Sequence, residues 1–177
     1  HRAEEFQRRL KGETYSQIAA QGGGILTTVR ATASEHDAVL EKTLAQRLER
    51  WRASGCTTVE VKSGYGLTPT AEMRLLEIMR AAAQRVPVRV HRTALLLHAM
   101  PESYRDRRER LLEELAGKTI PEIKRRELAT AVDAFCDEVG FTVEECRALL
   151  TRAKQEGFAV KLHAEQYRDF RAADLVA

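Results

Sequence analysis

The sequence has few cysteines and few aromatic residues, and each shortage narrows the possible classes of protein. Three cysteines occur in 177 residues, widely spaced and without a Cys-x-x-Cys pair, which argues against a disulfide framework and against a structural zinc site. Aromatic residues make up 6% of the chain against 44% hydrophobic residues. This composition favours one ordered α/β domain with an aliphatic core, in a reducing compartment.

The sequence also lacks long apolar stretches and an excess of one charge. No stretch approaches the ~18 apolar residues of a membrane helix, and no basic-then-apolar export signal begins the chain. Lysine and arginine number 29 against 26 acidic residues, and glutamates are interleaved with the arginines of region 105–126. We therefore expect a cytoplasmic protein with solvated helix faces, without a nucleic-acid or membrane partner.

Four segments have the composition of β-strands: 57–61, 88–97, 130–135 and 158–162. Helical patterns separate them, at 69–83, in the charged region 102–128, and after the capping box Thr142-x-x-Glu145. Upstream, residues 2–12 and a segment from Thr14 look helical. Ser34-x-x-Asp37 is expected to cap a long helix that buries Leu40, Leu44, Leu48 and Trp51 on one face and ends before Gly55. The glycines at 22–24 predict a flexible connection.

The strands recur every 30 to 40 residues with helices between them, the spacing of right-handed βαβ crossovers. We therefore predict a parallel sheet. Polar side chains follow each strand, as in a (β/α)₈ TIM barrel whose site lies at the carboxyl ends of its strands. A doubly wound sheet is the alternative, although no Gly-x-Gly-x-x-Gly turn is present.

The residues that could carry chemistry lie at those strand ends. His163, beside Glu165 and Gln166, is a candidate metal ligand or a structural histidine; a metal would need two or three further ligands. His98 follows an apolar strand, where it could handle a proton or end the strand with a satisfied imidazole. Tyr65 lies in a glycine turn, where its phenol could bind a ligand or pack locally. Arg2, on these grounds alone, is a surface residue.

Six motifs in this order resemble the imidazolonepropionase family of the metal-dependent amidohydrolase superfamily. They are Arg2-Ala-Glu-Glu-Phe, Tyr15-x-x-Ile, Gln21-Gly-Gly-Gly-Ile, Val59-Glu-Val-Lys-Ser-Gly-Tyr-Gly-Leu, His98-Ala-x-Pro and Lys161-Leu-His-Ala-Glu-Gln. The resemblance implies a (β/α)₈ barrel of the metal-dependent hydrolase type. It also implies one divalent metal ion, Zn or Fe, and hydrolysis of the cyclic amide C–N bond of 4-imidazolone-5-propanoate.

The matching motifs imply roles for individual residues. His163 would be a metal ligand, and His98 and Gln166 would contact the imidazolone ring. Arg2 and Tyr65 would hold the substrate, and Tyr15 would be a weaker candidate for the pocket wall. The full-length protein would act on a small molecule and could form a homodimer.

The resemblance also implies that residues 1–177 are the central part of a longer barrel, about strands two to five. The family's His-x-His pair would precede the first residue, and a later aspartate ligand would follow the last. Two departures from the family are Leu97, where glycine is usual, and the segment 170–172, which replaces a glycine-rich turn. Another amidohydrolase, such as a deaminase, or a non-catalytic α/β binding module remains as an alternative.

Overall fold

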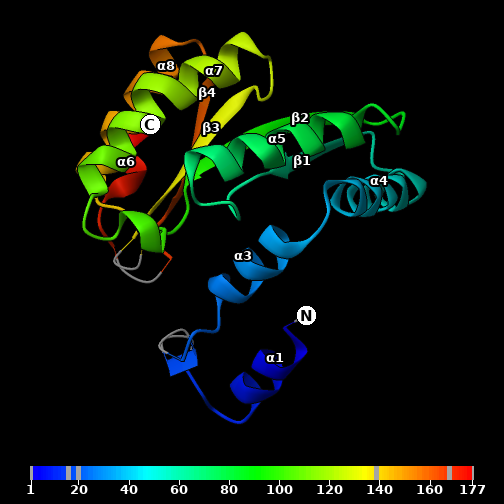
Figure 1. Cartoon of the computed structure of the whole chain (residues 1–177), viewed down its shortest axis with the longest axis horizontal. Helices are drawn as coiled ribbons and strands as arrows, with labels where there is room; N and C mark the ends of the chain where they lie inside the picture. The colour runs from blue at the N-terminus through cyan, green and yellow to red at the C-terminus, as the bar shows by residue number, and fades with distance from the viewer. Residues whose placement is uncertain (1, 15–16, 19–20, 138–139, 167–168, 177) are drawn as a thin grey trace.

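The computed structural model describes residues 2–14, 17–18, 21–137, 140–166 and 169–176 (Figure 1). Its helices and strands follow one another as helices α1 (Ala3–Leu10), α3 (Ile25–Ser34) and α4 (Asp37–Ala53), strand β1 (Thr58–Lys62), helix α5 (Pro69–Ala83), strand β2 (Arg89–Leu97), helices η1 (Glu102–Tyr104), α6 (Arg108–Glu114), η2 (Leu115–Thr119) and α7 (Ile120–Arg125), strand β3 (Ala131–Cys136), helix α8 (Val143–Gln155), strand β4 (Ala159–Ala164) and helix η3 (Ala172–Leu175). The four expected strands are all present, with bounds that differ from the expected ones by at most two residues.

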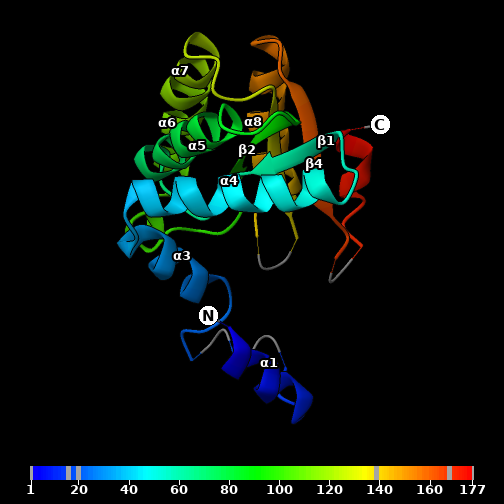
Figure 2. The same cartoon turned by 90° about the vertical axis from the view of Figure 1, so that its right-hand side faces the viewer.

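The strands form one sheet in the order β1-β2-β3-β4, and all three neighbouring pairs are parallel. Each crossover is helical, and α5 packs on β2 while α8 packs on β3 and β4. The strands lie side by side in the same order as in the sequence, and this order does not reverse at any point in the sheet. Such an order is typical of a barrel, whereas a doubly wound sheet reverses its strand order at a switch point. The structure is thus an α/β fold with a four-stranded parallel sheet, compatible with part of a TIM-like barrel (Figure 2).

The two faces of the sheet differ in chemistry. Alternate residues of the central strands, among them Ala94, Val132 and Ala134, belong to the hydrophobic core. Their neighbours Thr93 and Asp133 are polar and also buried. Because successive side chains of a strand point to opposite faces, the sheet has an apolar face and a face that carries polar groups.

Local signals explain how several elements begin. Thr142 caps α8 in the predicted capping box, since its hydroxyl accepts from the Glu145 amide while the Glu145 carboxylate accepts from the Thr142 amide. Thr68 caps α5, with Pro69 in the first turn. The irregular region near Gly117 is the π-helical η2, and Pro121 lies in the first turn of α7.

Two expectations upstream of the sheet were wrong. Ser34 does not cap the long helix, because it ends α3, a helix that the sequence pattern did not predict; α4 begins instead after His36 without a side-chain cap. The prediction of a helix here was confirmed by α4, but the prediction of which side chains it buries was wrong. Leu48 is the buried residue of α4, whereas Trp51 is 56% exposed.

Helix length and hydropathy also bear on membrane insertion. None of the helices within the described ranges is both long and apolar enough to cross a membrane.

Candidate active site

Four aromatic rings, one from each strand unit, form a row along the carboxyl end of the sheet. Tyr65 lies in the turn after β1, His98 follows β2, Phe135 lies on β3 and His163 on β4. Successive ring centroids are 5.2, 6.5 and 6.5 Å apart, and every pair meets edge to face. The structure therefore brings together three residues that the sequence had singled out separately and adds Phe135 between the two histidines.

A backbone carbonyl fixes the His98 imidazole. Its Nδ1 lies 2.7 Å from the carbonyl oxygen of Gly64, and since a carbonyl can only accept, Nδ1 carries the hydrogen. Burial lowers the pKa of His98, reinforced by the nearby His163 and opposed by the Gly64 bond and by Asp133. The ring is thus held neutral, with Nε2 left as an acceptor for a ligand.

The turn that positions Gly64 and Tyr65 is organised by one buried carboxylate. Glu72 of α5 is fully buried and accepts from the amides of Gly64, Gly66 and Leu67 at 2.6 to 2.7 Å. Burial raises the pKa of Glu72 despite these bonds. This role of Glu72 was not predicted from the sequence, because its partners lie five to eight residues upstream, in the glycine turn.

Strict steric limits apply in the same turn. Gly64 has a φ of +107°, and a Cβ atom there would lie 2.8 Å from Leu95 Cδ2 and 3.1 Å from His98 Nδ1. No side chain larger than hydrogen fits without displacing the strand residue or the imidazole. The glycine is therefore required for the close approach of the turn to His98.

His163 is held in a similar way by a carboxylate. Asp133 on β3 is fully buried, and its Oδ1 lies 3.1 Å from His163 Nδ1, while its Oδ2 accepts from Lys62 Nζ at 2.7 Å. The carboxylate accepts the Nδ1 hydrogen, so Nε2 is the ring nitrogen of His163 that Asp133 does not engage. A carboxylate behind a histidine is a usual second neighbour of a metal site.

The polar face continues toward the amino ends of the strands. Glu60 on β1 accepts from Thr93 at 2.6 Å and binds both Lys62 and Lys161. Burial alone would raise the pKa of Glu60, but the hydrogen bonds from Lys161, Thr93 and Lys62 outweigh it and lower the pKa to about 2. Polar groups therefore lie within the strands as well as after their ends, at Glu60, Asp133 and Lys161.

The residues after β4 serve different purposes. The backbone amide of Gln166 donates to Asp137 Oδ2 at 2.9 Å, and the Gln166 side chain is exposed. Glu165, with a φ of +54°, instead accepts from the amides of Ala172 and Ala173 at the start of η3. Gln166 is thus anchored at the sheet end by its backbone while its side chain is exposed, whereas Glu165 stabilises the chain that follows.

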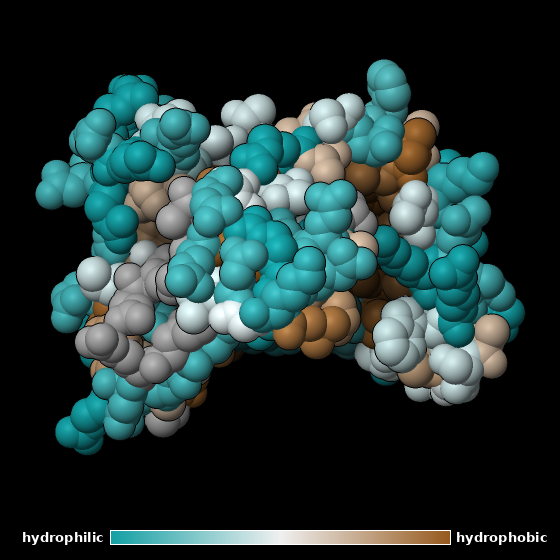
Figure 3. All heavy atoms as spheres, turned by 90° about the horizontal axis from the view of Figure 1, so that it is seen from below, coloured by the Kyte–Doolittle hydropathy of each residue, from teal (hydrophilic) through white to brown (hydrophobic). Residues whose placement is uncertain are grey.

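Arg2 and Tyr65 line one cavity of about 700 Å³, together with Lys62, Ser63 and residues of α3, α4 and α5. Seen from below, this side of the molecule is hollowed and shows hydrophobic side chains in the recess (Figure 3). Arg2 also pairs with Glu5 at 2.9 Å, so part of its charge is already compensated. Tyr15 lies outside the described residues.

The sequence analysis predicted that His163 binds a metal ion, which would need further ligand side chains around it. Within the described ranges, no group of three or more His, Cys, Asp or Glu side chains is placed to hold a metal ion. His163 therefore offers one ligand atom, Nε2, with Asp133 behind it. Leu97, one of the two departures from the family, is fully buried in the hydrophobic core directly before His98.

Sequence reasoning missed Asp133 and Phe135, which join the histidines. The sequence of β3 contains a feature that could have identified the aspartate: Asp133 is the lone charged residue in an otherwise apolar strand. A charge at such a position requires a buried partner, and Lys62 and His163 supply it.

No family model matches the chain. Curated relatives named imidazolonepropionase are similar to the chain. The one from Erwinia tasmaniensis is 45% identical over 176 residues, which are 99% of this chain and 44% of the relative. The Serratia proteamaculans protein is 42% identical over 180 residues, which cover 100% of this chain and 44% of the relative. The Pseudomonas fluorescens protein is 39% identical over 177 residues, again with 100% and 44% covered. The chain is therefore homologous, along its whole length, to somewhat less than half of an imidazolonepropionase.

Proposed function

We propose that the intact protein hydrolyses the ring C–N bond of 4-imidazolone-5-propanoate to N-formimidoyl-L-glutamate, a step of histidine degradation. The similarity to relatives named imidazolonepropionase supports this over the full chain. The observation that carries the proposal is the row of rings at the carboxyl end of the sheet. There Nδ1 of His98 and of His163 each has a partner, and neither Nε2 has one among the described residues.

His98 would act on the imidazolone ring. A neutral imidazole with a free Nε2 can accept a hydrogen bond from a ring N–H or take its proton as the bond breaks. Tyr65 packs its ring edge to face against His98 and so limits the directions from which a planar substrate can approach. Gln166 would present its exposed amide to the same ring.

Arg2 would bind the propanoate carboxylate. A guanidinium suits a planar carboxylate because it offers two parallel N–H donors. Arg2 lines the same cavity as Tyr65, and this supports a carboxylate-binding role for Arg2 beside one end of the row of rings. Tyr15 completes the proposal as a weaker candidate for the pocket wall.

The family resemblance adds one divalent metal ion, Zn or Fe, with His163 as a ligand through Nε2. A bound metal ion would lower the pKa of its water and polarise the ring carbonyl. The residues present fit that role in part: Asp133 fixes the imidazole in the orientation that frees Nε2. The remaining ligands would have to come from outside the described residues.

A barrel of the metal-dependent hydrolase type, of which residues 1–177 form about strands two to five, belongs to this proposal. So do the cytoplasmic location and a possible homodimer.

The test is turnover of 4-imidazolone-5-propanoate by the purified intact protein, with product identity established by mass spectrometry. Ring opening to N-formimidoyl-L-glutamate is the expected result. A protein that instead releases ammonia from an exocyclic amine of another heterocycle would be a deaminase. A folded protein with stoichiometric metal and no action on the imidazolone would contradict the proposal.

A further inference from the structure

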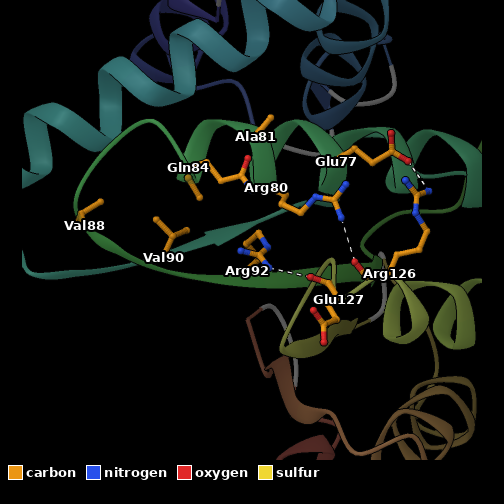
Figure 4. Close-up of a pocket in the computed structure, with 10 residues that line it drawn as sticks. Glu77, Arg80, Ala81, Gln84, Val88, Val90, Arg92, Arg126 and Glu127 are labelled. Carbon is orange, nitrogen blue, oxygen red and sulfur yellow. Dashed lines mark hydrogen bonds and ion pairs between the residues drawn. The ribbon is translucent and has the colours of Figure 1, made fainter.

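A second cavity, of about 670 Å³, lies at the opposite end of the sheet from the row of rings. Helix α5, the start of β2 and the loop after α7 enclose it (Figure 4). It is lined by Glu77, Arg80, Ala81, Ala83, Gln84, Val88, Val90, Arg92, Arg126 and Glu127. Three arginines and two glutamates therefore share a space that the proposed function does not use.

The three arginines differ in their partners. Arg126 forms an ion pair with Glu77, with 2.6 Å between Nη1 and Oε1. Arg80 and Arg92 have no carboxylate partner among the residues that the structure describes. They bind neutral carbonyl groups instead: Arg80 that of Arg126 at 3.1 Å, and Arg92 those of Leu128 and Glu127 at 2.7 and 2.9 Å.

These two guanidinium groups are also close enough to repel each other. The pKa of Arg92 is lowered, first by burial and then by the charge of Arg80. Figure 4 shows both groups pointing from α5 and β2 toward the same loop, with the Glu127 side chain directed away from them. Two like charges are thus held at one loop by hydrogen bonds to the backbone carbonyls of residues 126–128.

The simpler interpretation is that both arginines only hold the loop after α7. It accounts for the three carbonyl bonds, but neutral carbonyls do not compensate two positive charges. Each guanidinium has five N–H donors, of which Arg80 uses one and Arg92 two in these bonds. Donors therefore remain for a negatively charged ligand held between the two groups.

We propose that this cavity binds a small organic dianion, a phosphate ester or a dicarboxylate, between Arg80 and Arg92. Paired guanidinium groups suit both oxyanions through parallel N–H donors. Val88, Val90 and Ala81 provide an apolar wall for the carbon part of the ligand. The proposal is independent of the hydrolase, because it concerns binding and no turnover.

The experiment measures binding of inorganic phosphate and of succinate to the intact protein by isothermal titration calorimetry, at constant ionic strength set with chloride. Arg80→Gln and Arg92→Gln should each weaken binding by about 10-fold or more. Glu77→Gln should strengthen it, since the change removes a negative charge from the cavity lining and the shorter of the two ion pairs of Arg126, which also lies 4.0 Å from Glu122. Arg89→Gln is the matched control, an exposed arginine on the same strand that does not line the cavity.

The two probes separate the ligand classes. Tighter binding of phosphate indicates a phosphate ester, and tighter binding of succinate a dicarboxylate. If Arg92→Gln fails to fold through loss of its two carbonyl bonds, Arg80→Gln and Glu77→Gln still test the site in opposite directions. Absence of saturable binding of either probe to the folded protein would overturn the proposal, as would binding that neither of these two variants changes.

Discussion

The carboxylate of Asp133 lies 3.1 Å from Nδ1 of His163 on the neighbouring strand. The same carboxylate accepts from Lys62, so its two oxygens serve two strands at once. Asp133 therefore sets the direction of the His163 ring while its own charge is compensated by lysine.

We predict that His163→Ala abolishes metal binding and turnover of the intact protein together. Asp133→Asn should retain a hydrogen bond partner of similar shape but lose the charge behind the imidazole, and should weaken metal affinity roughly 10- to 100-fold. Metal analysis by mass spectrometry during chelator titration measures both effects. The exposed Asp106 provides the control Asp106→Asn. Stoichiometric metal and normal activity in His163→Ala would reassign the ligand.

His98→Ala should behave differently, sparing metal content while lowering kcat by roughly 10²- to 10⁴-fold. The reason is that His98 follows a different strand from His163 and is tied to Gly64 rather than to a carboxylate. Kinetics beside metal analysis check this, with the exposed His36 changed to Ala as control. Loss of metal together with activity would place His98 among the ligands.

Gly64→Ala should destabilise the fold by about 1 to 3 kcal/mol. The substitution combines a positive φ with contacts of 2.8 Å to Leu95 and 3.1 Å to His98. Gly55→Ala is the matched control, since Gly55 has a φ of +94° but no atom within 4 Å of an added Cβ. Urea unfolding of both variants separates the backbone strain from the collision. Equal losses would show that crowding around Gly64 contributes nothing.

Glu60 should make stability depend on pH under acidic conditions. Its pKa falls from 4.5 to about 2 on folding, so its contribution is fully present above about pH 4.5 and is lost as the pH falls toward 2. Because the side chain is 34% exposed, solvent screening reduces the expected contribution to about 1 kcal/mol. Denaturant unfolding between pH 2 and 7 should show this loss in the original protein and a smaller one in Glu60→Gln. Identical profiles would remove Glu60 as a cause.

Residues 1–177 expressed alone should associate and be inactive. Among the described residues, β1 and β4 each pair with a single strand, so each leaves backbone donors and acceptors open to another chain. Sedimentation velocity over a range of concentrations measures the association. A monodisperse monomer with bound metal and turnover would contradict both halves of this prediction.

The positions of the strands could be predicted because β-branched and apolar residues mark them and helical patterns separate them. The capping box at Thr142 could also be predicted, because it depends only on Thr142 and Glu145, which are three residues apart in the sequence. Helix α3 was missed because β-branched residues give it a weak helical pattern and it buries none of its residues. The sequence pattern predicted a buried Trp51, although burial depends on packing that a single helix does not specify.

The site could be predicted as a set of residues but not as a network. Lys62 and Asp133 are 71 positions apart, and Glu60 and Lys161 are 101 apart. Their contacts join strands that do not pair with each other, β1 with β3 and β1 with β4, so they arise only from the curl of the folded sheet. The family resemblance identified His98 and His163 from motifs. It did not identify Phe135, which lies between them, or the carbonyl and carboxylate that orient their rings.

The carboxylate of Glu72 has a consequence for engineering. Because the turn after β1 is held by the helix that directly follows it, residues 58–83 carry their own support for the loop. The shape of the loop is thus tied to α5 by Glu72 and to β2 by the bond between the Gly64 carbonyl and His98. A graft of this turn into another protein would therefore have to carry α5 with it and keep the contact with the strand beside it.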